Sequence, residues 1–293
     1  LLDTYFGTMT ATEINGFPRL RFLTSDFSPF SQRARIALDW FKMPYEPIEG
    51  MSSPAAGVKY EKHPLLLEKN PKGLIPTLVV NWPDGREEVV TQSLAMVEYI
   101  DDLAAKFELK GTPLLPRDDT AERQRILKAA SFYNENIASP FYAVLMRNDK
   151  TEFDKMVAGA EKFVAEMRGP FFNGSQMCLV DVTIYPWIQR SFLLGHYKGP
   201  TLDLSRESQP QLGKLFDWYD RMSAVDEVKA TIMPPDYFIK VYAKLAEGVA
   251  SSQSLVGDDE SVAPLLRLAK LLCAESQLTP SRSRFVAFAL SFV

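Results

Sequence analysis

Residues 20–41, LRFLTSDFSPFSQRARIALDWF, carry the pattern on which the fold prediction rests. The first five residues have the alternation and composition of a β-strand. Ser28-Pro29 predicts a helix start, because serine caps free backbone N–H groups and proline suits the first helical position. The residues that then recur at helical spacing on one face are Phe30, Ala34, Ala37, Leu38 and Phe41. This stretch therefore predicts a strand followed by a helix.

The sequence on the C-terminal side predicts that this pair belongs to a small mixed sheet. Further strands are expected at residues 45–48, 77–80 and 88–90. A turn-rich segment, residues 70–76, precedes the third strand, and Pro83-Asp84-Gly85 predicts a turn before the fourth. Helical periodicity then runs from Ser93 to about Phe107. The order β-α-β, then β-β-α, indicates an α/β domain with helices on the faces of the sheet.

The chain length of 293 residues favours two compact domains. After a linker at 109–119, strand patterns give way to amphipathic helical ones. The predicted division is a lead-in at 1–17, the α/β domain at 18–108, an all-helical domain at 120–247, and a tail at 248–293 with no assigned role.

The composition is that of an ordinary globular protein, with 46% hydrophobic and 24% charged residues. A net charge of −4 gives no reason to expect nucleic acid or an anionic membrane as the main partner. No apolar run approaches the roughly 20 residues that span a bilayer. The two cysteines, Cys178 and Cys273, fit a reducing compartment, so a cytoplasmic location is expected.

Three motifs indicate chemistry. Ser28 places a hydroxyl at a helix N-terminus, where backbone N–H groups and the helix dipole favour a negative charge such as a thiolate. A cis bond before Pro76 would free the backbone of Ile75 to pair with an extended peptide. Ser93 is expected to cap the next helix, where a carboxylate could bind with help from Gln92. Each motif read singly also fits an ordinary cap or loop proline.

In this order and spacing, SPFSQR (28–33), NPKGLIP (70–76) and TQSLAMVEYI (91–100) closely resemble the thioredoxin-like domain of glutathione transferases. The resemblance continues through the helical domain to about residue 245. DVTIYPWIQR (181–190) matches the pattern D-x-x-I-x-P-W-x-x-R of the omega class. The chain therefore resembles the omega, dehydroascorbate-reductase and chloride-intracellular-channel branch, and glutathione is the implied substrate.

The resemblance implies a role for each matching residue. Ser28 occupies the catalytic position beside the glutathione sulfur. Ile75, ahead of cis Pro76, would bind the cysteinyl unit, while Gln92 and Ser93 would hold the γ-glutamyl carboxylate.

Three further roles follow from the same resemblance. Lys62 has the spacing of the residue that pairs with the glycyl carboxylate. Phe30 would line one wall of the glutathione site. Trp187 matches a residue lining the co-substrate cleft, with a core position as the alternative.

Two departures from the family pattern matter. Omega enzymes and dehydroascorbate reductases carry Cys at the position of Ser28, and serine cannot form their mixed disulfide with glutathione. Zeta, theta and delta enzymes use a serine there to stabilise the glutathione thiolate by a hydrogen bond. Cys178 replaces the usual hydroxyl of a capping box, so Asp181 is expected to act as a structural cap. His63 and His196 lack metal-ligand spacing, and no metal is expected.

Three functions remain open at this point. The first is a glutathione transferase that attacks a small hydrophobic electrophile and serves detoxification. The second is a glutathione- or ligand-binding module or scaffold with little catalysis. The third is a thiol transferase or dehydroascorbate reductase lineage that has lost its cysteine. The resemblance also implies a homodimer.

Overall fold

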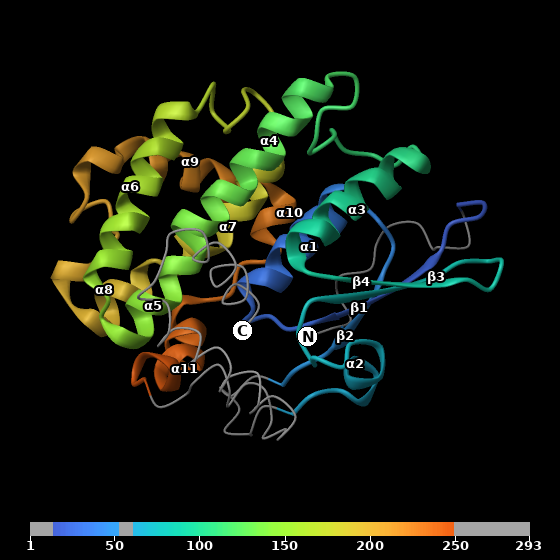
Figure 1. The fold of residues 1–293 in the computed structure, drawn as a ribbon, viewed down its shortest axis with the longest axis horizontal. Helices are drawn as coiled ribbons and strands as arrows, with labels where there is room; N and C mark the ends of the chain where they lie inside the picture. Colours follow the sequence, from blue (N-terminus) through green and yellow to red (C-terminus); the bar gives the residue numbers. More distant parts are fainter. Residues whose placement is uncertain (1–13, 53–60, 249–293) are drawn as a thin grey trace, which may run out of the picture.

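The computed structural model of the chain describes residues 14–52 and 61–248. Most of the predicted lead-in, nearly all of the predicted tail and Cys273 lie outside these residues. Within the described part, a sheet with its helices comes first, and helices follow (Figure 1). This architecture is the predicted one, a thioredoxin-like domain followed by an all-helical region.

The sheet has four strands in the order β2-β1-β3-β4. Their bounds are Arg19–Thr24 for β1, Glu46–Glu49 for β2, Thr77–Asn81 for β3 and Glu87–Thr91 for β4. β1 runs parallel to β2, whereas β3 is antiparallel to both β1 and β4. The parallel pair needs a crossover, and helix α1 (Pro29–Trp40) supplies it.

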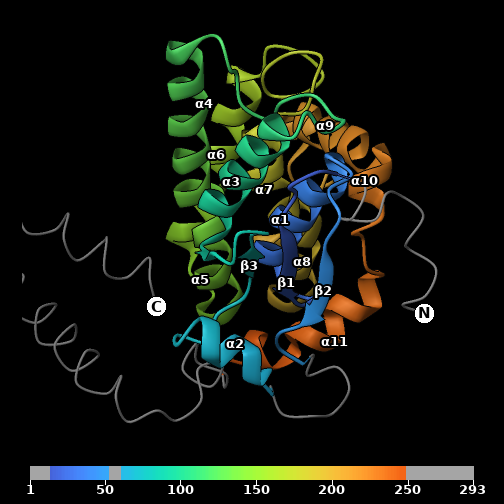
Figure 2. The same cartoon turned by 90° about the vertical axis from the view of Figure 1, so that its right-hand side faces the viewer.

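Alternation along the strands decides what covers each face of the sheet. Leu20 and Phe22 of β1 belong to the main core with α1 and α3 (Ser93–Lys106). Leu23, one position on, packs with Val79 and with Leu66 of α2 (Pro64–Lys69) on the opposite face. Figure 2 shows the sheet between these helices.

Helix α2 was not expected from the sequence. It has only six residues, which is too short for a helical period to show. A signal was present in the pair His63-Pro64, because Pro64 occupies the first helical turn and His63 Nδ1 accepts a hydrogen bond from the Leu65 amide at 3.1 Å.

The second region consists of helices packed around α7. Its elements are α4 (Thr120–Tyr133), a π-helical turn (Asn134–Ala138), α5 (Ser139–Arg147), α6 (Lys150–Glu166), α7 (Leu179–Arg190), α8 (Phe192–Lys198), α9 (Gly213–Ala224), α10 (Asp226–Lys229) and α11 (Pro235–Ala246), with short 3₁₀ turns at Pro200–Leu202 and Pro210–Leu212. All residues of α7 are buried, as expected for a helix surrounded by others.

Helix α1 is covered on two sides, because the sheet and α3 pack on one face and α7 and α10 on another. This corrects the predicted one-sided amphipathic pattern. The polar residues Gln32 and Arg33 are buried, whereas Phe30, which was placed on the apolar face, is 37% exposed. The second domain is the physical reason, since it supplies partners for the polar side of α1.

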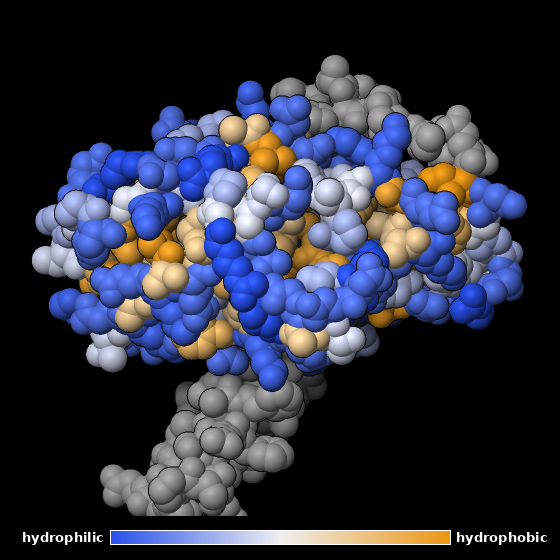
Figure 3. All heavy atoms as spheres, turned by 90° about the horizontal axis from the view of Figure 1, so that it is seen from above, coloured by the Kyte–Doolittle hydropathy of each residue, from blue (hydrophilic) through white to orange (hydrophobic). Residues whose placement is uncertain are grey.

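The surface seen in Figure 3 is mainly hydrophilic, with small and separate hydrophobic patches. Among the described residues, no helix combines the length and apolar character that crossing a membrane requires.

Candidate functional site

The register of the sheet brings the three predicted motifs to one end. Thr77, which follows the Ile75–Pro76 bond, pairs with Leu23 near the end of β1 and with Thr91 at the end of β4. The chain after β1 leads to Ser28, and the chain after β4 leads directly to Gln92 and Ser93. Strand pairing therefore gathers segments that are far apart in the sequence.

Ser28 is the N-cap of α1, with φ −79° and ψ 119°. Its Oγ accepts a hydrogen bond from the Ser31 amide at 3.2 Å, and the residue is 5% exposed. Because the oxygen is the acceptor in this bond, the hydroxyl hydrogen remains able to donate to a ligand. The predicted helix cap at Ser28 and the predicted proline in the first helical turn are both present.

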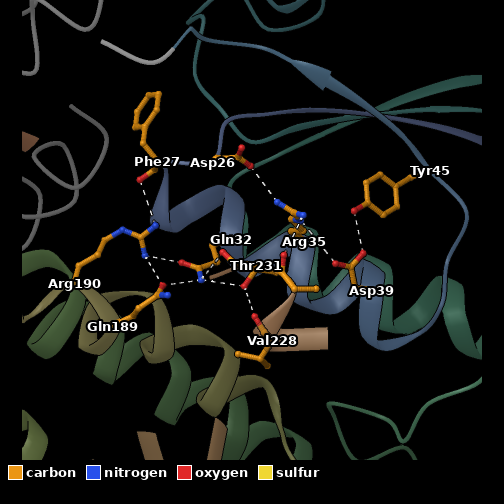
Figure 4. Close-up of polar contacts among 11 residues, drawn as sticks. Asp26, Phe27, Gln32, Arg35, Asp39, Tyr45, Gln189, Arg190, Val228 and Thr231 are labelled. Carbon is orange, nitrogen blue, oxygen red and sulfur yellow. Dashed lines mark hydrogen bonds and ion pairs between the residues drawn. The ribbon is translucent and has the colours of Figure 1, made fainter. Parts of the chain in front are cut away.

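The residue before Ser28 is held by the helical region. The carbonyl oxygen of Phe27 accepts hydrogen bonds from Arg190 Nη2 at 3.3 Å and from Tyr242 Oη at 3.0 Å. Figure 4 shows Arg190 reaching this carbonyl from α7. Side chains of α7 and α11 thus restrain the turn that presents the Ser28 hydroxyl.

The Ile75–Pro76 peptide bond is cis, as the resemblance implies. Within the described residues, the amide and carbonyl of Ile75 make no hydrogen bond to another main-chain group. Gly50 packs closely on the Ile75 side chain, because a Cβ at Gly50 would lie 2.9 Å from Ile75 Cγ2. The main chain of Ile75 is therefore unpaired at the end of the sheet where Ser28 lies.

Lys62 lies beside the same proline loop. It forms an isolated bridge with Met51, and a Cβ on Gly73 would lie 2.8 Å from Lys62 Nζ. Desolvation by this packing lowers the pKa of Lys62. The loop itself is tied by Asn70, whose Nδ2 donates to the Leu74 carbonyl at 3.0 Å.

Gln92 and Ser93 show one departure from the prediction. Gln92 has φ 64° and ψ 115° and is the N-cap of α3, so Ser93 is the first helical residue and not the cap. Ser93 Oγ instead accepts a hydrogen bond from Arg33 Nη1 at 3.1 Å. The left-handed φ of Gln92 turns the chain from β4, which ends at Thr91, directly into α3.

Trp187 does not line an open cleft in the described structure, because its side chain is completely buried. Its ring meets that of Phe30 edge to face with centroids 5.0 Å apart. The Arg33 guanidinium lies over the Trp187 ring, with its Cζ atom 4.1 Å from the ring centroid. The core alternative is therefore the one observed, and Phe30 is the partly exposed aromatic residue of this group.

A buried polar network joins α1 to the helical region (Figure 4). Gln32 Nε2 donates to Gln189 Oε1 at 2.8 Å and to Thr231 Oγ1 at 3.0 Å. The Oε1 atom of Gln32 accepts from Arg190 Nη1 at 2.5 Å. Sequence reasoning missed this network, although Gln32 and Arg190 stand inside the quoted motifs, because no spacing rule places residues 158 positions apart together.

Asp181 is completely buried near the start of α7. Its Oδ2 accepts from the Cys178 amide at 2.8 Å, and its Oδ1 accepts from the Phe172 amide at 2.9 Å and from Trp218 Nε1 at 2.7 Å. Burial raises the pKa of Asp181, and these donors oppose that effect. Burial also raises the pKa of the Cys178 thiol well above its ordinary value.

The sequence of this chain is similar to those of known proteins. The family model "Glutathione S-transferase, N-terminal domain" matches residues 27–103. Pyrimidodiazepine synthase of Drosophila melanogaster is 30% identical over 214 residues, which are 73% of this chain and 81% of that protein. A probable glutathione transferase omega-2 of Caenorhabditis elegans is 27% identical, with 76% of this chain and 84% of that protein covered.

The fold itself is also found among solved structures. Rice GST1 in complex with glutathione aligns with a TM-score of 0.64 at 22% identity, covering 80% of this chain and 99% of the rice protein. Within the described residues, no group of three or more His, Cys, Asp or Glu is arranged to hold a metal ion.

Proposed function

The chain belongs to the glutathione transferase superfamily, in its omega-like branch, and on this premise we propose that it binds glutathione and activates its thiol with Ser28. The observation that carries the proposal is the hydrogen bond from the Ser31 amide to Ser28 Oγ. It orients the hydroxyl at the N-terminus of α1 with its hydrogen free to donate to sulfur, where the helix dipole favours an anion.

The expected effect is on the ionisation of the glutathione thiol. An ordinary thiol has a pKa of about 8.5, so only a few per cent is thiolate at pH 7. A hydrogen bond to the charged form, about 1.5–3 kcal/mol, lowers the pKa by roughly one to two units. The thiolate then attacks the electrophile, a sulfur–carbon bond forms, and the leaving group departs with its electron pair. Serine acts here by electrostatic stabilisation and forms no covalent bond.

We expect the remaining contacts to glutathione at the end of the sheet where the motifs lie together. The unpaired main chain of Ile75 suits strand-like pairing with the cysteinyl unit, ahead of Pro76. Gln92 and Ser93 begin α3 and would bind the γ-glutamyl carboxylate. The ammonium of Lys62 would pair with the glycyl carboxylate.

The second substrate of the proposed reaction is a small hydrophobic electrophile. Phe30 supports this choice, because it is a large apolar residue that is 37% exposed and lies two positions after Ser28. A cytoplasmic homodimer remains part of the proposal on the grounds given by the sequence, namely the cysteine content and the family resemblance.

Ser28→Ala tests the mechanism. We expect the turnover number with 1-chloro-2,4-dinitrobenzene to fall by about tenfold to hundredfold, since the lost hydrogen bond is worth about 1.5–3 kcal/mol. The pKa of bound glutathione, followed by thiolate absorbance, should rise in parallel. Ser31→Ala is the matched control, because it removes a buried hydroxyl from the same helix. Undiminished turnover in Ser28→Ala would remove Ser28 from the mechanism, and glutathione binding without turnover on any electrophile would favour a binding module.

A second candidate function, the thiol transferase lineage, is favoured by the omega-like relatives. Position 28 is a helix N-cap whose side chain accepts a hydrogen bond from a backbone amide, and a cysteine at such a position has a lowered pKa. Ser28→Cys is therefore expected to create dehydroascorbate or mixed-disulfide reduction with glutathione as reductant. No gain of activity in a variant that still binds glutathione would count against this lineage.

A further inference from the structure

Arg33 is a buried cation that has no carboxylate partner in the described part of the chain. The residue is 1% exposed, and no ion pair among the described residues includes it. Each of its three nitrogens donates to a neutral oxygen: Nε to the Thr183 carbonyl at 2.8 Å, Nη2 to Asn134 Oδ1 at 2.7 Å, and Nη1 to Ser93 Oγ at 3.1 Å. The guanidinium is therefore hydrogen-bonded but not neutralised.

An isolated buried charge is costly, and buried arginines in proteins are usually paired. Desolvation lowers the pKa of Arg33 to about 9. The faces of Trp187 and Phe30, 4.1 and 5.7 Å from the guanidinium carbon, compensate in part through cation–π contact. The protein retains this charge next to a residue that is a candidate to bind a ligand.

Arg190 offers a comparison within the same chain. It too is buried, has no ion pair among the described residues, and lies 4.2 Å from the centroid of the Phe238 ring. Its acceptors are carbonyl and amide oxygens of Phe27, Gln32, Pro186 and Gln189. None of these is a predicted ligand-binding group, whereas Arg33 donates directly to Ser93.

The bond between Arg33 and Ser93 decides what the Ser93 hydroxyl can do. A guanidinium only donates, so Ser93 Oγ is the acceptor and its own hydrogen points elsewhere. Ser93 is also the first residue of α3, where backbone N–H groups lack helical partners. An oriented O–H, free N–H groups and a nearby unneutralised cation together favour a carboxylate.

We propose that Arg33 is a positioning residue for the γ-glutamyl end of glutathione: it orients the Ser93 hydroxyl as a donor and supplies the charge that the γ-glutamyl carboxylate neutralises. The inference rests on the proposed function, because it takes glutathione as the ligand. Arg33 also bonds to Thr183 of α7 and to Asn134 of the π-helical turn, so the same side chain anchors the carboxylate site to the helical region.

Calorimetry with two ligands tests this role. Glutathione is compared with 4-aminobutanoyl-Cys-Gly, which keeps the amino group and lacks only the γ-glutamyl carboxylate. Wild-type protein is expected to prefer glutathione by about tenfold to hundredfold, the range for hydrogen bonds to a charged group. In Arg33→Met the preference should fall by about tenfold, while the Kd of the analogue stays within about twofold. Arg35→Met, on the same helix with its charge paired to Asp26, should keep the wild-type preference.

The outcomes separate the inference from its premise. Equal weakening of both ligands in Arg33→Met would mean a purely structural role, and an unchanged preference would mean no role; either result overturns the proposal. If the wild type binds neither ligand, the proposed function is wrong, and the inference that rests on it is wrong as well. Should Arg33→Met not fold, Arg33→Lys keeps the charge but loses the planar fork. Its preference is expected to fall by about threefold with the analogue unaffected, and equal weakening there again overturns the proposal.

Discussion

Replacement of Asp181 is expected to destabilise the protein more than a change at an exposed aspartate. Its carboxylate is the acceptor for three buried donors, the amides of Phe172 and Cys178 and the indole N–H of Trp218. Asp181→Ala leaves all three without a partner. At about 1–3 kcal/mol for each unsatisfied buried donor, and allowing for incomplete additivity, the free energy of unfolding should fall by about 3–6 kcal/mol.

Asp181→Asn refines the same prediction. The amide keeps one oxygen, so it can serve the two donors of Oδ1 or the one of Oδ2, but its NH₂ group then faces another donor. A smaller loss of about 1–3 kcal/mol is expected. Asp154→Asn is the matched control, because Asp154 is exposed and forms an ion pair with Lys150, and exposed pairs contribute about 0–1 kcal/mol.

Urea unfolding followed by fluorescence measures all three variants. With an m value of about 3 kcal/mol/M, Asp181→Ala should lower the midpoint by about 1–2 M and leave m unchanged. The reasoning is refuted if Asp181→Ala and Asp154→Asn unfold within about 1 kcal/mol of each other, since the three hydrogen bonds would then carry no net stability.

Three other predictions follow from single contacts. Cys178 should resist alkylation in the native protein from pH 7 to 9, because burial raises the pKa of its thiol, and rapid labelling of the native protein would contradict this prediction. For the same reason the free energy of unfolding should fall above about pH 9, where only the thiol of the unfolded chain ionises. Lys62→Met should weaken glutathione about threefold to tenfold but not its glycyl ethyl ester, and equal weakening of both would exclude the carboxylate pairing. Gln32→Leu should lower the free energy of unfolding by about 2–4 kcal/mol, because it removes one buried hydrogen bond from each of Gln189, Arg190 and Thr231. A loss below about 1 kcal/mol in urea would contradict this prediction.

Features with short-range causes were predictable from the sequence. The cap at Ser28 and the proline after it depend on neighbouring backbone groups, and both occur in the structure. Strand alternation and turn residues likewise predicted the four strands within one or two residues. The order and spacing of the three glutathione-transferase-like motifs predicted the fold class, because that information lies along the chain.

Tertiary packing decided the features that depend on distant partners. Phe30, expected on the apolar face of α1, is partly exposed, and Trp187, for which a core position was one of two alternatives, is buried against α1. Whether Arg33 meets Thr183, or Arg190 meets Gln32, depends on how the helical region packs against α1. Local sequence preferences do not encode that arrangement, because hydrogen bonds between these polar side chains become strong only when both packed surfaces are buried away from water.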